Sequence, residues 1–223
     1  MKHFTTLRIG CLLLTSAFFV QGCAQPSNKS LLERGNYAMW QGRWADARGD
    51  FEKAAIQHPG DWRAQYNLGK CYMEMGEPQT ASQSLAIAES LRPFDIEVAD
   101  LYAASLLESG NQNKLYSYLH KRAQTQQTVR AWTIFANYAM ELDDPDSATS
   151  AINTAIELSN GTNETPYIAA ATFAQQLGDD ALAITLWKQA WSINPSNKTV
   201  AEAIRSYGEV PGPTMTGLVD DSE

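Results

Sequence analysis

Two stretches of similar sequence decide the fold: GRWADARGDFEKAAIQHP at Gly42–Pro59 and GEPQTASQSLAIAESLRP at Gly76–Pro93. They begin 34 residues apart, and both have Gly first, Pro last and apolar residues at the same inner positions. GDDALAITLWKQAWSINP at Gly178–Pro195 keeps this spacing, and DDPDSATSAINTAIELSN at Asp143–Asn160 keeps it with different terminal residues. A fixed period of this length indicates an array of stacked units.

Each shared position has a physical reason. A Gly ends one helix in a tight turn, and a Pro stops the next helix. Between them, a small residue marks the closest crossing of two helices, and a large apolar residue packs between neighbouring units. The small residues are Ala47, Ala81, Ala148 and Ala183, and the large ones are Phe51, Leu85, Ile152 and Trp187. Upstream, Gly35 and Gly69 also repeat at 34 residues, where they would let the helices of a hairpin approach closely.

This pattern resembles the tetratricopeptide repeat, a helical hairpin of 34 residues. The resemblance implies an all-α, right-handed α-solenoid of about five hairpins plus a C-terminal capping helix, with the first helices lining a concave face. The expected hairpins are Asn28–Asp61, Trp62–Asp95, Ile96–Thr128, Val129–Thr162 and Asn163–Asn197, and the expected cap is Lys198–Gly208. The third copy is the weakest, because Leu115 occupies the crossing position where Ala is expected.

The N-terminus has the features of a secretory signal peptide. Lys2 and Arg8 precede an apolar run at 9–20, which is shorter than the ~20 residues that a bilayer span needs. The following Val20-Gln21-Gly22-Cys23 resembles a lipobox, in which the Cys thiol receives diacylglycerol. The alternatives are an ordinary signal peptide with a chance Cys, or an uncleaved anchor. Ala24 after this Cys, in place of Asp, favours the outer membrane, facing the periplasm.

These observations divide the chain into four expected parts. They are a lipoprotein signal peptide at 1–22, a lipidated tether at 23–30, the solenoid at 31–208 and a flexible acidic tail at 209–223. Cleavage before Cys23 leaves 15 of the 17 basic residues against all 25 acidic ones, a net charge of −10. That charge disfavours nucleic acid and anionic lipid as electrostatic partners, so the acyl chains would attach the protein to the membrane.

The sequence offers no constellation for catalysis or metal binding. His58 and His120 are isolated, and no nucleophile elbow, phosphate-binding loop or dinucleotide motif is present. The Asp143–Asp146 cluster falls at a turn and lacks calcium-loop spacing. We therefore expect no enzymatic activity, no cofactor, no metal and no small-molecule substrate.

The resemblance also implies which residues face the concave groove. In the first hairpin these are Lys29, Leu32, Asn36, Met39 and Trp40; in the second, Arg63, Tyr66, Lys70, Met73 and Glu74; in the fourth, Arg130, Thr133, Asn137, Met140 and Glu141. Some members of the family clamp a peptide carboxylate. Here Asn36 and Asn67 match the clamp asparagines, but Leu32 replaces its Lys and Glu97 and Leu101 replace its bases.

A protein segment held by apolar contacts and backbone hydrogen bonds is therefore expected along the first two hairpins. The candidate peptide-binding residues are Asn36, Trp40, Arg63, Tyr66, Asn67 and Lys70. The asparagines could instead be solvated or bonded within the repeats, and Trp40 could pack or stack on a sugar.

The expected function is a lipid-anchored scaffold for cell-envelope assembly, similar to pilus and secretion accessory lipoproteins. The partner would be a protein held in the concave groove, with the membrane contacted through the N-terminal lipid. The alternative is a docking or regulatory subunit for a peptidoglycan-processing enzyme.

Overall fold

A computed structural model describes residues 26–212, so the predicted signal peptide, Cys23 and most of the predicted acidic tail lie outside the described residues. The described residues form α-helices and no strand, which confirms the all-α prediction. The helices are α1 (Asn28–Trp40), α2 (Trp44–Gln57), α3 (Trp62–Glu74), α4 (Pro78–Leu91), α5 (Ile96–Glu108), α6 (Gln112–Gln126), α7 (Val129–Glu141), α8 (Pro145–Ser159), α9 (Thr165–Gln176), α10 (Asp180–Ile193) and α11 (Lys198–Ser206).

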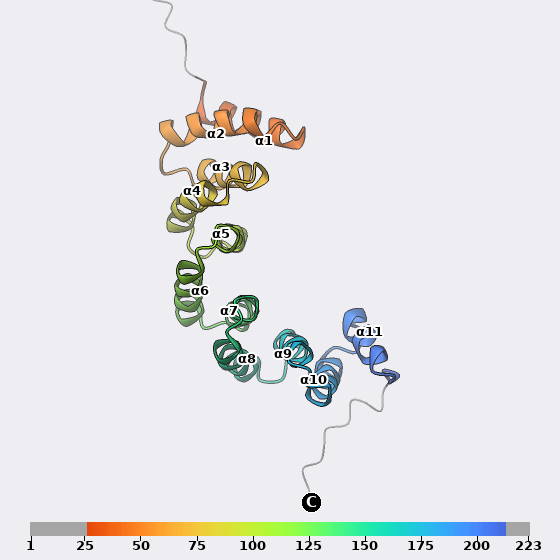
Figure 1. Ribbon diagram of the computed structural model, residues 1–223. Helices are drawn as coiled ribbons and strands as arrows, with labels where there is room; N and C mark the ends of the chain where they lie inside the picture. The colour runs from red at the N-terminus through yellow and green to blue at the C-terminus, as the bar shows by residue number, and fades with distance from the viewer. Residues whose placement is uncertain (1–25, 213–223) are drawn as a thin grey trace, which may run out of the picture.

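The helices form five consecutive hairpins followed by the single helix α11. Figure 1 shows the stack bending into an arc, with α3, α5, α7 and α9 on its inner side and α4, α6, α8 and α10 on its outer side. The first helix of each hairpin therefore lines the concave face, as expected. The predicted solenoid of five hairpins and a capping helix is confirmed, and its curvature brings the inner faces of successive hairpins toward a common groove.

Short polar side chains start the first helices of the hairpins. Asp61 accepts a hydrogen bond from the Arg63 amide at 3.1 Å, and Thr128 accepts one from the Ala131 amide at 3.2 Å. These caps satisfy amides that have no partner inside the helix. Ser27 caps α1 in the same way, so helix begins at Asn28, within the segment 23–30 that the sequence suggested as a tether.

The turns within the hairpins require the left-handed backbone region. Glycines occupy it in four hairpins, at φ between 71° and 77°: Gly42, Gly76, Gly110 and Gly178. In the fourth hairpin Asp143 adopts it, at φ 57°. Asn160 and Gln127 end α8 and α6 in the same conformation, at φ 46° and 49°. These two helices are therefore stopped by a left-handed residue, where the other hairpins have Pro.

The large residues of the repeat pattern lie fully buried beneath the glycines of the first helices. A Cβ atom on Gly35 would lie 2.6 Å from Cε1 of Phe51, and one on Gly69 would fall against Cγ of Leu85. Phe51 and Leu85 are inaccessible to solvent, and so are the crossing alanines. The missing side chain is thus what allows the two helices of a hairpin to come together.

The third hairpin departs from this arrangement. Leu115 is fully buried at its crossing position, and α5 and α6 pack less extensively against each other than the two helices of any other hairpin. Arg122 on α6 instead ties this helix to the preceding hairpin. Its Nη1 lies 2.8 Å from Glu89 Oε1 on α4 and donates to the Pro93 carbonyl at 2.8 Å. Both charged side chains are almost buried, and burial raises the pKa of Glu89.

We expect Gly69→Ala to lower the free energy of unfolding by about 1–3 kcal/mol, because the added methyl group overlaps the immobile Leu85 side chain. Gly49→Ala on α2 is the matched control. A Cβ there meets no atom within 4 Å, and alanine gains about 1 kcal/mol in a helix. Chemical denaturation of both variants measures the difference. Equal effects at the two positions would contradict the proposed close approach.

Arg122→Met should destabilise the fold by about 3 kcal/mol at neutral pH, because it leaves the buried Glu89 carboxylate without its cation. Removing Arg122 raises the pKa of Glu89 further. Protonation then favours the folded state, so the deficit should shrink as pH falls from 7 toward 5 and grow again as pH rises.

Urea denaturation across this pH range checks the effect. The double variant Glu89→Gln/Arg122→Met should lose the extra pH dependence, because the titrating group is gone. A single-variant deficit that does not change with pH would argue against a buried carboxylate as its cause.

Candidate functional site

The six residues predicted to bind a peptide lie on α1 and α3, in the first two hairpins. Asn36 and Asn67 meet across the two helices, where Asn67 Nδ2 donates to Asn36 Oδ1 at 3.1 Å. This hydrogen bond is the inter-repeat alternative considered from the sequence. It uses one donor and one acceptor, and each amide retains further hydrogen-bonding capacity.

The other predicted residues on α3 surround an aromatic pair. The rings of Trp62 and Tyr66 lie 6.2 Å apart, and the guanidinium groups of Arg63 and Arg92 lie 5.9 and 4.9 Å from the Trp62 ring. Burial, reinforced by the nearby carboxylates of Glu97 and Asp95, raises the pKa of Tyr66. Arg63 is therefore drawn toward the loop before α3, whereas Tyr66 is half-buried and Lys70 lies one helical turn further along.

Trp40 lies apart from this group, near the end of α1. It is 80% exposed and stacks on Tyr37 with a centroid distance of 5.9 Å. The structure thus brings the two asparagines together and leaves Trp40 and Arg63 at opposite margins. The six residues do not form one hollow, although Arg63 lines a shallow depression beside the α2–α3 loop.

The inner face is hollowed further along the chain, between α5, α7 and α9. Two adjoining hollows of about 610 and 370 Å³ share Thr133, Asn137 and Glu141 of α7. The α9 side is formed by Thr165, Ile168, Thr172 and Gln176. We call this the α7 groove. Its α7 residues were expected on the concave face, but its α9 residues were missed, although the same repeat positions counted along the fifth hairpin identify them.

The α7 groove offers mostly uncharged hydrogen-bonding groups. The hydroxyls of Thr133 and Thr172 donate to carbonyls one turn earlier in their own helices, both at 2.9 Å, which leaves their oxygens as acceptors. Asn137 is exposed, and its amide can both donate and accept. Arg130 and Asp100 form an exposed ion pair at 3.3 Å at one end. This chemistry suits the backbone of an extended protein segment.

An apolar hollow of about 490 Å³ continues the α7 groove at the Arg130 end. We call it the α5–α7 socket; it is lined by Phe94, Ile96, Ala99, Leu119, Ala131 and Ile134, with Asp100 and Arg130 shared with the groove. Phe94 is 72% exposed, and Ile96 is also largely exposed. The sequence signal was an aromatic residue directly after Pro93, where the corresponding positions carry Gly60 and Ser196.

The socket lies beside the loosely packed third hairpin. Leu119 on α6 and Ala99 on α5 form its floor, and both belong to the hairpin whose crossing residue is Leu115. A bulky crossing residue holds the two helices apart, which opens space between α5 and α7. The departure of this copy from the repeat pattern thus coincides with the most apolar hollow on the inner face.

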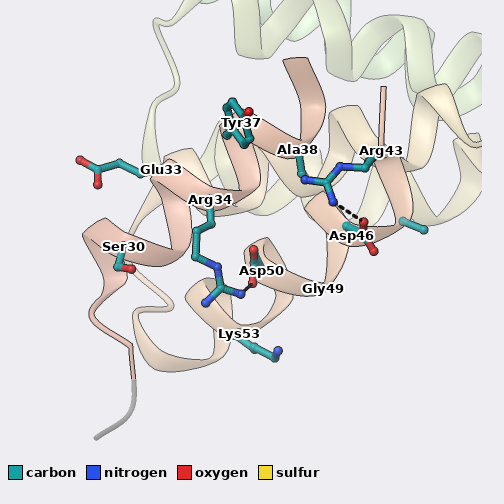
Figure 2. Close-up of a pocket in the computed structure, with 11 residues that line it drawn as sticks. Ser30, Glu33, Arg34, Tyr37, Ala38, Arg43, Asp46, Gly49, Asp50 and Lys53 are labelled. Carbon is teal, nitrogen blue, oxygen red and sulfur yellow. Dashed lines mark hydrogen bonds and ion pairs between the residues drawn. The ribbon is translucent and has the colours of Figure 1, made fainter. Parts of the chain in front are cut away.

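A separate hollow of about 680 Å³ lies between α1 and α2, on the side of the first hairpin that faces away from α3. Figure 2 shows Arg34 of α1 reaching across it to Asp50 of α2, with Arg43 and Asp46 paired at its edge. Charged pairs thus dominate this surface.

Two absences hold for residues 26–212. No helix there combines the length and apolar character of a membrane crossing. No group of three or more His, Cys, Asp or Glu side chains in the same range is arranged to hold a metal ion.

Comparison with known proteins places this architecture. Residues 38–105 match the tetratricopeptide repeat family. No curated protein sequence matches the chain.

Several solved structures resemble the chain at low sequence identity. MamA 41-end from Desulfovibrio magneticus RS-1 is 14% identical, with a TM-score of 0.57 over 77% of this chain and 97% of that one. TTC0263, a thermophilic TPR protein in Thermus thermophilus, is 16% identical, with a TM-score of 0.52 over 81% and 98%. YrrB, described as a TPR protein with an unusual peptide-binding site, is 14% identical, with a TM-score of 0.54 over 82% and 93%. The described chain therefore has the fold of tetratricopeptide repeat proteins.

Proposed function

We propose that this protein is a lipid-anchored interaction scaffold of the bacterial cell envelope, serving pilus, secretion or outer-membrane machinery. Proteins of this fold typically bind other proteins and are not enzymes, which supports the binding role. The observation that carries the proposal is the continuous inner-face surface formed by the α7 groove and the α5–α7 socket. Its shape suits a ligand longer than one residue.

The two parts of this surface fit different features of a protein segment. The socket would take an apolar side chain, since its walls are aliphatic and aromatic. The groove would hold the adjoining backbone, because Asn137 can donate to a carbonyl and accept from an amide. An apolar anchor flanked by an extended stretch is thus the favoured ligand.

The first two hairpins can extend this site. Tyr66 and Lys70 lie on the inner helix α3, and Asn36 and Asn67 retain hydrogen-bonding capacity beyond their mutual bond. A ligand that continued along the arc from the socket would meet α3 next. We retain these residues as secondary contacts and place the main anchor at the socket.

Ile134→Glu should remove most binding of the natural partner, because it places a charge in the apolar socket. Ile56→Glu is the matched control, since Ile56 is 78% exposed on α2 and lies outside the groove. Affinity purification from detergent-solubilised membranes, followed by mass spectrometry, would compare the variants, and circular dichroism would check folding. Unchanged capture by folded Ile134→Glu would contradict the socket.

The double variant Tyr66→Ala/Lys70→Ala separates the two parts of the site in the same experiment. Strong loss with this variant and none with Ile134→Glu would move the anchor to the first two hairpins. The proteins recovered with the wild-type chain distinguish the functions. Pilus, secretin or outer-membrane components support the scaffold, whereas peptidoglycan-processing enzymes favour a docking or regulatory subunit.

The anchor is proposed from Val20–Cys23, which resembles a lipobox. Labelled palmitate should be incorporated into the wild-type chain and lost in Cys23→Ser, because the acylated thiol is removed. Cys71→Ser is the matched control. Cys71 is buried, and burial raises the pKa of its thiol to about 11, so it should carry no label. Labelling that persists in Cys23→Ser would refute lipidation at this residue.

A further inference from the structure

One face of the first hairpin is left uncovered by the rest of the described chain. In every later hairpin, the preceding hairpin packs against three positions of the first helix. At these positions α3 has Ala64, Leu68 and Cys71, all buried. The corresponding residues of α1 are Ser30, Arg34 and Tyr37. We call the surface formed by them and the adjoining side of α2 the end face.

The end face carries paired charges where later hairpins have an apolar contact. Arg34 binds Asp50 at 2.5 Å, and Arg43 binds Asp46 at 3.2 Å, as Figure 2 shows. Lys53 adds a further cation at the edge of the hollow. The chain as a whole carries eight more acidic than basic residues, yet this face has no excess of negative charge. It therefore lacks the charge that would repel an anionic surface.

Two exposed aromatic side chains border the same surface. Tyr37 is 57% exposed and Trp40 is 80% exposed, and the two rings stack on each other. Trp40 lies where the end face meets the concave face, one helical turn beyond Tyr37. Exposed Trp and Tyr are typical of surfaces that contact the boundary between water and lipid, because their rings are apolar and their N–H and O–H groups stay hydrated.

The distance to Cys23 limits where this face can lie. α1 begins five residues after Cys23, and five fully extended residues span at most about 18 Å. α1 itself is about 20 Å long. If acyl chains on Cys23 are embedded in a bilayer, the whole of α1 lies within reach of the lipid headgroups.

We propose that the end face rests on the membrane surface, with Tyr37 and Trp40 in the headgroup region. This inference depends on the proposed lipid anchor at Cys23. The occupant is a phospholipid bilayer, which the aromatic pair, the lack of excess negative charge and the short connection all favour. The first hairpin would then orient the solenoid, and the α5–α7 socket would be held away from the bilayer by the intervening hairpins.

Spin labels can test this orientation in the full-length lipidated protein reconstituted in phosphatidylethanolamine–phosphatidylglycerol vesicles. A nitroxide on Gln41→Cys reports on the exposed end of α1, and one on Lys198→Cys reports on α11 at the opposite end. We expect the label at 41 to lose collisions with a water-soluble nickel chelate and to retain those with oxygen. The label at 198 should collide freely with the chelate.

Adding Tyr37→Ser and Trp40→Ser should restore chelate collisions at position 41 while palmitate incorporation is unchanged. Equal chelate access at 41 and 198 in palmitate-labelled protein would overturn the membrane contact and leave the anchor intact. Dipolar broadening between labels at 41 would also overturn it, in favour of an interface between two copies. Absence of palmitate would instead refute the anchor on which the inference depends.

Discussion

The close approach of two helices within each hairpin is the constraint on which the structure depends. It requires a residue without a side chain at Gly35 and Gly69, and a large apolar residue directly opposite. Burying Phe51 or Leu85 contributes roughly 1.5–3 kcal/mol each. Ordering the backbone costs about 1–2 kcal/mol per residue, so one such contact cannot hold a hairpin alone. Each hairpin therefore requires its neighbours, and the arc follows from repeating one contact.

The period of the sequence was sufficient to predict this architecture. Turn, crossing and packing positions recur at fixed spacing, so each helix could be placed from local residues alone. The ends of α6 and α8 show the limit of such prediction. The expected Pro is absent there, and the backbone turns at Gln127 and Asn160 instead. A left-handed Gln is not evident from sequence, because the conformation depends on the packing that follows it.

The site was less predictable than the fold. Repeat positions identified which residues line the inner face, but not where that face is hollow. Hollowing depends on the tilt of α6, which Leu115, Arg122 and Glu89 determine together across two hairpins. The pairing of Asn36 with Asn67 is a similar case. Their positions were evident from the sequence, but whether the two amides bond each other or a ligand depends on a distance that only the structure provides.

The loose packing of α5 against α6 also has a mechanical consequence. A chain of elastically coupled units bends most at its weakest coupling, so strain applied at either end of this solenoid concentrates in the third hairpin. The tie from Arg122 to Glu89 keeps α6 with the preceding hairpin, which leaves α5 as the more compliant wall of the opening beside it. The stiff hairpins on both sides then act as levers, and a change in curvature alters the width of that opening before it alters any other part of the inner face.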